Sequence, residues 1–157
     1  MALSSDLIAT ARQLAHVHQR RLRQADLRRS ISTSYYALFH GLAELAASRL
    51  VGSTSTAHKS SAWTRVYRAL NHITAKKASG RQELQDSSLE LGQFLVAFPR
   101  LQELRHQADY DPTARFKLGG EALSTTDDAK RGMVGLQGAP RDEHLDFNTL
   151  ALGVTRS

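Results

Sequence analysis

The sequence predicts an all-α protein, built as an antiparallel up-and-down bundle of four to five helices. Apolar residues recur at three- and four-residue spacing through most of the 157 residues, which is the spacing of one helix face. The connectors between these stretches are short and polar, as they are between antiparallel neighbours in a bundle. No internal repeat and no convincing pair of strands interrupts this pattern. The length is enough for one hydrophobic core and one domain.

Two helices are expected in the N-terminal third of the chain. The first covers about residues 4–17, where Ser4 or Ser5 stands in the N-cap position. The second is longer, from about 25 to 50. It ends before Gly52, because glycine readily adopts the left-handed conformation that follows a helix.

A shorter helix and the longest apolar stretch are expected next. The short helix covers "AWTRVYRALNHI" (62–73), between the polar loop "GSTSTAHKSS" and the connector "TAKKASGRQ". The apolar spacing then continues from Leu84 to Asp111, where it stops because a residue that precedes proline avoids the helical conformation. Pro99 within this stretch either kinks one helix or starts a second one at its first turn.

The last expected helix, over about 118–136, is weaker because glycines dilute its apolar pattern. From residue 137 onward we expect a loosely held tail, since "LDFNTLALGVTRS" is short and lacks caps. The predicted organisation is therefore one helical domain, 1–136, followed by a tail, 137–157.

Composition and motifs exclude several kinds of chemistry. The chain has no cysteine, so it has no disulfide, no thiolate metal site and no cysteine nucleophile. It contains no His-Glu-x-x-His zinc motif, no phosphate-binding glycine-rich loop and no nucleophile elbow. We therefore expect neither a metal nor a cofactor. The apolar runs are too short to span a bilayer and no secretion signal is evident, so we expect a cytoplasmic protein without a membrane segment.

A basic cluster stands out against the net charge of +6. The stretch "HQRRLRQADLRRS" holds five arginines: Arg20, Arg21, Arg23, Arg28 and Arg29. Such a cluster suits contacts with the phosphates of a nucleic acid, for which the first four are candidates, or with an acidic protein. A solvated helix face explains the same charges equally well.

The second helix carries two faces that both suit packing. One is an apolar stripe, and the opposite one holds Arg29, Tyr36 and His40 together with the small residues Ala43 and Ala47. This pattern predicts a central helix that is contacted by its own bundle and by something else, such as a second subunit. The alternative for Tyr36 and His40 is a hydrogen-bonded pair one helical turn apart.

The stretch "RHQADYDP", residues 105–112, concentrates polar groups at the end of the longest apolar stretch. Arg105 and Asp109 are one turn apart on its apolar side, so we expect an ion pair near the core. His106 and Tyr110 form a second pair one turn apart, rotated towards the edge. These groups either tie off the helix end or take part in binding or catalysis.

Two segments together resemble the HEPN-domain proteins. The segment "SISTSYYALFHGLAEL" resembles their Ser-x-x-Tyr-Tyr-Ala-x-Phe-His helix. The segment "LQELRHQADYDP" resembles the Arg-x-x-Ala-Asp-Tyr-Asp segment of one prokaryotic branch. The resemblance covers roughly residues 5–135. It implies a homodimeric bundle of four or five helices, often paired with a nucleotidyltransferase-type antitoxin in a toxin–antitoxin or defence-type system.

The resemblance leaves more than one function open. Many HEPN proteins are metal-independent ribonucleases with an Arg, a polar residue and a His four to six positions on. Here Arg105 and His106 fit the beginning of that pattern, and Tyr110 stands near the place of the later His. The first hypothesis is a non-enzymatic homodimer that binds a nucleotidyltransferase-type partner, nucleotide or RNA, with Asp109, Arg29, Tyr36 and His40 at its interface or binding surface.

The second hypothesis is a metal-independent endoribonuclease toxin. In it Arg105 stabilises the phosphorane charge, His106 or His40 is the base, and Tyr110 positions the phosphate. The third is a structural helical bundle that acts through protein interactions alone.

Overall fold

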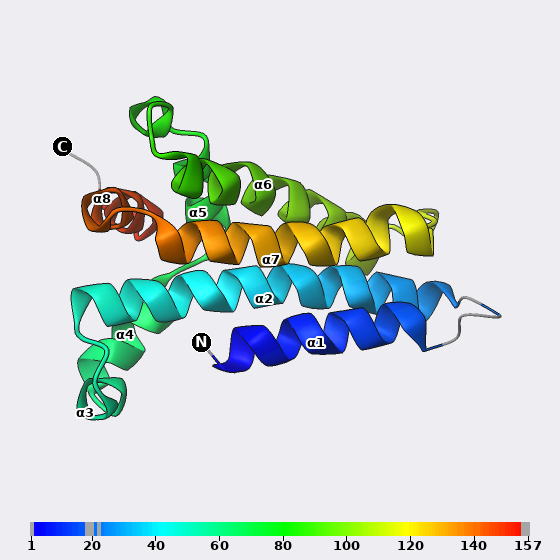
Figure 1. The fold of residues 1–157 in the computed structure, drawn as a ribbon, viewed down its shortest axis with the longest axis horizontal. Coiled ribbons are helices and arrows are strands. Elements are labelled where there is room, and N and C mark those ends of the chain that lie inside the picture. Colours follow the sequence, from blue (N-terminus) through cyan, green and yellow to red (C-terminus); the bar gives the residue numbers. More distant parts are fainter. Residues whose placement is uncertain (1, 18–20, 22, 155–157) are drawn as a thin grey trace.

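The computed structural model describes residues 2–17, 21 and 23–154, and these residues form helices and no strand. Four long helices make the body of the molecule: α1 (Ala2–His16), α2 (Gln24–Leu50), α6 (Leu89–Tyr110) and α7 (Leu123–Gly138). Helices α1 and α2 run in opposite directions, as do α6 and α7 (Figure 1). The predicted all-α class is confirmed. No helix of the described residues combines the length and the apolar composition that crossing a bilayer requires.

Helix α2 is the central helix of the bundle, packed against α1, α6 and α7 (Figure 1). Leu38 and Leu42 are fully buried on its apolar stripe, and Ala43 and Ala47 are fully buried on the other side. The second predicted packing face is therefore confirmed at Ala43 and Ala47, which are buried by elements of this same chain. On the same face Arg29 is exposed, and Tyr36 and His40 are partly exposed.

Small polar residues hold α2 to its neighbours. The Ser30 hydroxyl donates to the carbonyl of Ala11 in α1 at 2.7 Å. Ser34 Oγ lies 3.1 Å from Thr126 Oγ1 of α7. These buried hydroxyls have partners, as groups removed from water require, and they allow three helices to approach closely.

Helices α6 and α7 meet where α7 carries glycine. A Cβ atom on Gly132 would lie 3.1 Å from the Cβ atom of Ala97, and one on Gly135 would overlap the carbonyl oxygen of Glu90. Two of the glycines that dilute the apolar pattern of the last predicted helix, Gly132 and Gly135, are thus its contact points with α6. Pro99 lies inside α6, which continues through it as one helix, so the alternative of a break is wrong.

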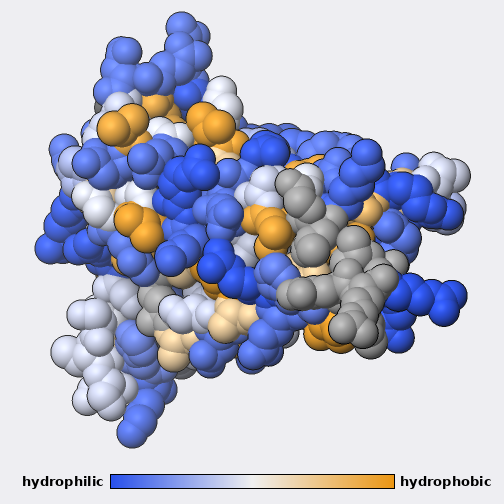
Figure 2. All heavy atoms as spheres, turned by 45° about the vertical axis from the view of Figure 1, so that its right-hand side comes forward, coloured by the Kyte–Doolittle hydropathy of each residue, from blue (hydrophilic) through white to orange (hydrophobic). Residues whose placement is uncertain are grey.

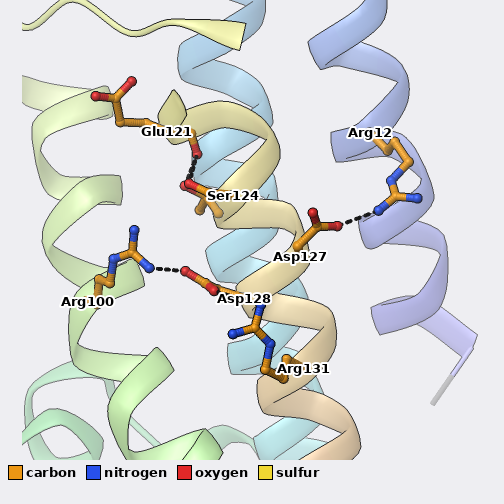
Figure 3. A network of polar contacts seen from close by, with 8 residues as sticks. Arg12, Arg100, Glu121, Ser124, Asp127, Asp128 and Arg131 are labelled. Carbon is orange, nitrogen blue, oxygen red and sulfur yellow. Dashed lines mark hydrogen bonds and ion pairs between the residues drawn. The ribbon is translucent and has the colours of Figure 1, made fainter. Parts of the chain in front are cut away.

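Exposed ion pairs add to the packing of α7 (Figure 3). Asp127 accepts from Arg12 of α1 at 2.6 Å, and the neighbouring Asp128 pairs with Arg100 of α6. Arg131 also lies 3.6 Å from Asp128. Solvent screens such pairs, so each contributes about 0–1 kcal/mol and they orient helices more than they stabilise the fold.

The segment between α2 and α6 differs from its prediction. The expected helix over 62–73 is two helices, α4 (Ser61–Ala69) and α5 (His72–Ser79), so the expected connector "TAKKASGRQ" is largely helical. Asn71 explains the division, because its side chain accepts from the backbone N–H of Thr74 at 2.9 Å and caps α5.

Three short turns complete the chain. Helix α3 (Ser55–His58) lies in the expected polar loop, and its N-cap is Thr54. A 3₁₀ turn, η1 (Gln82–Leu84), precedes α6, and a π-helical turn, η2 (Leu118–Ala122), leads into α7. The expected last helix therefore begins as a wider turn and becomes α-helical at Leu123.

The C-terminal segment is a packed helix rather than the loosely held tail expected from residue 137. Helix α8 (Arg141–Ala151) lies beside α5, and Phe147 is fully buried with its ring centroid 5.3 Å from that of Phe94. The Glu143 carboxylate accepts from the backbone N–H and the hydroxyl of Ser88, at 2.9 and 2.6 Å, at the start of α6. One buried aromatic ring and one carboxylate thus fix the segment.

Candidate functional site

Arg105, on the last turns of α6, lies among three tyrosine rings. Its guanidinium carbon is 5.3 Å from the ring centroid of Tyr35, 5.9 Å from that of Tyr36 and 5.8 Å from that of Tyr110. The first two rings are neighbours on α2, and the third is on the same helix as the arginine. Only 11% of the Arg105 side chain is exposed. The cation is therefore held largely by aromatic faces.

The predicted ion pair of Arg105 and Asp109 is present. Arg105 Nη1 lies 3.6 Å from Asp109 Oδ2, and the same oxygen accepts from Ser32 of α2 at 3.3 Å. The Nε atom of Arg105 is buried and has no hydrogen-bond partner in the described part of the chain. The guanidinium is thus paired loosely, with donor capacity left over.

Tyr35 and His72 form a buried contact behind this arginine. The Tyr35 hydroxyl lies 2.5 Å from Nδ1 of His72, whose ring stacks on Phe39 at 4.0 Å. Burial raises the pKa of Tyr35. Burial, with the charge of Arg105 and the nearby His40, lowers the pKa of His72. The contact therefore joins a neutral phenol to a neutral imidazole at pH 7.

His40 does not form the hydrogen bond with Tyr36 that one alternative predicted. Its Nδ1 lies 2.5 Å from the hydroxyl of Tyr67 on α4, and burial lowers the pKa of His40. The rings of Tyr36 and His40 are still neighbours, with centroids 6.3 Å apart. The sequence interpretation missed Tyr67, although Trp63 and Tyr67 stand one turn apart on a short amphipathic helix.

These rings continue into a row of aromatic side chains that crosses α3, α4 and α2. Successive centroids are 4.7 Å apart for His58 and Trp63, and 5.2 Å apart for Trp63 and Tyr67. Tyr67 then stacks on His40 at 6.0 Å, and His40 adjoins Tyr36. Each of the five rings is at least partly exposed. We call these five side chains the aromatic row; Arg105 lies at its Tyr36 end.

The predicted second pair lies at the edge. The rings of His106 and Tyr110 are 5.1 Å apart, His106 is exposed, and 66% of Tyr110 is exposed. Tyr110 therefore contacts the enclosed Arg105 on one side and an accessible imidazole on the other.

The end of α6 is also closed as predicted. Asp111 Oδ1 accepts from the backbone N–H of Thr113 at 2.8 Å, and hydrogen bonds from Thr113 lower the pKa of Asp111. "RHQADYDP" thus ends the helix and at the same time places Arg105, His106 and Tyr110 together.

The arginines of the basic cluster differ in their surroundings. Arg28 donates to the carbonyls of Ala108 and Ala114 at 2.9 and 2.6 Å and fastens the end of α6 to α2. Arg23 pairs with Asp26 at 2.8 Å. Two further members, Arg21 and Arg29, are exposed, and Arg20 lies outside the described residues.

One face of the molecule is mostly hydrophilic (Figure 2). On the face shown in Figure 2, apolar side chains lie in separate small patches. Within the described ranges, no three His, Asp or Glu side chains are placed to hold a metal ion.

Comparison with known proteins adds no relative. No family model matches the sequence, and neither a curated protein nor a solved structure is significantly similar to it. The fold and the site together define an all-helical bundle in which an arginine is enclosed by tyrosines at the end of an aromatic row.

Proposed function

We propose that this chain is a HEPN-type homodimeric module that binds nucleotide or single-stranded RNA through Arg105 and the aromatic row. Its setting is a toxin–antitoxin or defence-type system, with a nucleotidyltransferase-type protein as the partner. The observation that carries the binding proposal is the loosely paired Arg105 guanidinium among Tyr35, Tyr36 and Tyr110.

The chemistry of these groups favours unpaired bases over folded duplexes. Bases stack on aromatic faces without regard to sequence, and a cation beside the rings attracts the phosphate backbone. The 3.6 Å separation of Arg105 Nη1 and Asp109 is longer than a hydrogen bond, so a phosphate oxygen can compete for the guanidinium. The neutral His40 and His72 add polarity without charge.

Replacing Arg105 or Tyr110 is expected to weaken the binding of a short single-stranded oligouridylate. In fluorescence anisotropy, Arg105→Gln and Tyr110→Ala should each raise Kd about fivefold or more. Tyr110→Ala removes stacking on one ring, which contributes about 1–3 kcal/mol, and Arg105→Gln removes the cation that attracts the phosphate backbone. Arg105→Gln should also lower the melting temperature, because Asp109 loses its partner. Tyr110 is largely exposed, so Tyr110→Ala should stay folded and report on binding alone.

Lys130→Gln on α7 is the matched control, because Lys130 is exposed and lies on the side of α7 that faces α1. It should change Kd little. Equal affinity of the original protein, Arg105→Gln and Tyr110→Ala for the oligouridylate would contradict the binding proposal. A monomeric mass at micromolar concentration in analytical ultracentrifugation would contradict the homodimer.

A metal-independent endoribonuclease is the second candidate. The observation in its favour is the accessible imidazole of His106, a base whose ring lies 5.1 Å from that of Tyr110, the ring that the Arg105 cation also contacts. If it is correct, inducing the protein arrests growth and degrades RNA, and Arg105→Ala does neither. Intact RNA after incubation with purified dimer in a chelating buffer rules this candidate out.

A further inference from the structure

A cleft of about 660 Å³ opens at the end of the molecule opposite Arg105 along α2. Its walls include Arg49 from the last turn of α2, Gly52 and Ser53 from the following loop, and Arg141, the first residue of α8. From Tyr36 to Arg49 the distance along α2 is about 20 Å, at about 1.5 Å per residue. This cleft is therefore distant from Arg105, although Ser48 in its wall contacts His58 and Trp63 at the other end of the aromatic row.

Arg49 is a partly buried cation without a partner. Its Nε atom is buried and makes no hydrogen bond, and the described residues give its guanidinium neither an ion pair nor a hydrogen bond. The other partly buried arginines differ: Arg105 pairs with Asp109, and Arg28 donates to two carbonyls. Buried charge is normally compensated, so an anion is the expected missing neighbour of Arg49.

The opposite wall of the cleft is also positive. Arg141 is exposed and makes no ion pair within the described ranges. It begins α8, whose N-cap is Pro140, so no side chain caps the first N–H groups of this helix. Of the two acidic residues in its first turn, Glu143 is turned away, to Ser88 at the start of α6, and Asp142 is exposed and does not line the cleft. None of the described residues that line the cleft is acidic.

His144 on α8 lies close enough to Arg49 for the two groups to interact electrostatically. Its ring is fully buried, as is Asn148 one turn further on, and it has hydrogen-bonding neighbours in the backbone of Leu136 and Ala139. Burial and the charge of Arg49 lower the pKa of His144. The neutral imidazole of His144 therefore does not compensate the positive charge of Arg49, and it adds no second positive charge.

We propose that this cleft binds the phosphate group of a small anion, either inorganic phosphate or a mononucleotide. Arg49 and Arg141 supply planar guanidinium groups, which match the oxygens of a phosphate better than an ammonium group does. The proposal stands independently of RNA binding at Arg105.

Thermal unfolding of the full-length protein in rising inorganic phosphate, at constant ionic strength, tests this site. We expect a saturable rise in melting temperature, because a ligand that binds only the folded state stabilises it. Arg49→Gln and Arg141→Gln should each raise the apparent Kd about tenfold or more. Arg141 makes no contact that folding requires, so Arg141→Gln keeps the test interpretable if Arg49→Gln is unstable.

Arg68→Gln on α4 is the matched control, because it removes the same charge at an exposed position without altering the cleft. Its Kd should equal that of the original protein. A parallel titration with adenosine monophosphate distinguishes the two sources of phosphate by their relative affinities. Absence of a saturable shift with both probes, or an unchanged Kd in Arg141→Gln, would overturn the proposal.

Discussion

Replacing Gly135 with alanine is expected to lower the free energy of unfolding by about 3 kcal/mol, the upper part of the range for forcing an atom into a packed interface. The added Cβ atom overlaps the carbonyl oxygen of Glu90, and it also comes within 3.0 Å of the Cβ atom of Gln93. Backbone atoms do not rotate away as a side chain does, so α7 has to move from α6. Urea unfolding followed by circular dichroism measures the loss.

Gly92→Ala is the matched control on the opposing helix. No heavy atom lies within 4 Å of a Cβ atom built there, so the substitution creates no overlap. Because alanine favours the helix and restricts the unfolded chain, Gly92→Ala should raise stability by about 0.5–1 kcal/mol. Equal effects of the two substitutions would show that α6 and α7 are not in direct backbone contact.

Acidification is expected to destabilise the protein through three histidines. Burial lowers the pKa of His40, His72 and His144 in the folded state. Below about pH 6.5 these histidines become protonated in the unfolded chain, whereas in the folded protein they stay neutral down to a lower pH. Their contribution to stability is therefore fully present above about pH 6.5. It is lost as the pH falls towards the folded pKa values, by up to about 1.4 kcal/mol per pH unit for each histidine.

The charged and titratable neighbours of these rings agree with that sign. Arg105 and His40 oppose a charge on His72. Arg49 opposes one on His144, and this repulsion exceeds the attraction of Glu143. Urea unfolding between about pH 7.5 and pH 5 should show a falling midpoint, and His144→Gln should make the fall shallower. His106→Gln, at an exposed ring, is the control; a midpoint independent of pH would contradict the prediction.

Local spacing predicted those parts of the fold that depend on one helix. The extent of α2 and its end before Gly52 follow from apolar period and turn chemistry, and the structure has both. Arg105 and Asp109 pair because residues four apart in a helix face each other, whatever surrounds them. The placement of Tyr110 beside His106 follows in the same way.

Spacing within a single helix could not predict the contacts between segments that are distant in the sequence. His40 is hydrogen-bonded to the hydroxyl of Tyr67, and Tyr35 is hydrogen-bonded to His72, because α4 and α5 fold back on α2. No spacing within either segment encodes this approach. From the sequence alone Gly135 only weakens a helix; its role as a contact point becomes visible only when α6 is packed against α7.

Adjacent tyrosines on α2 also have unequal consequences for any variant study. Tyr35 is fully buried and bonded to His72, whereas Tyr36 is partly exposed beside the aromatic row. Loss of binding in a Tyr35 variant therefore indicates a folding defect first, whereas loss of binding in a Tyr36 variant indicates that the exposed surface itself binds the ligand.

The contact of Glu143 with Ser88 bears on how the protein is made. It joins residues 55 positions apart, and α8 is the last helix of the described chain to leave the ribosome. Until it does, Phe94 lacks the ring of Phe147 against which it packs, and the start of α6 lacks its carboxylate. Such incomplete chains expose apolar surface during synthesis. The nascent protein therefore remains open to chaperones and proteases until α8 docks.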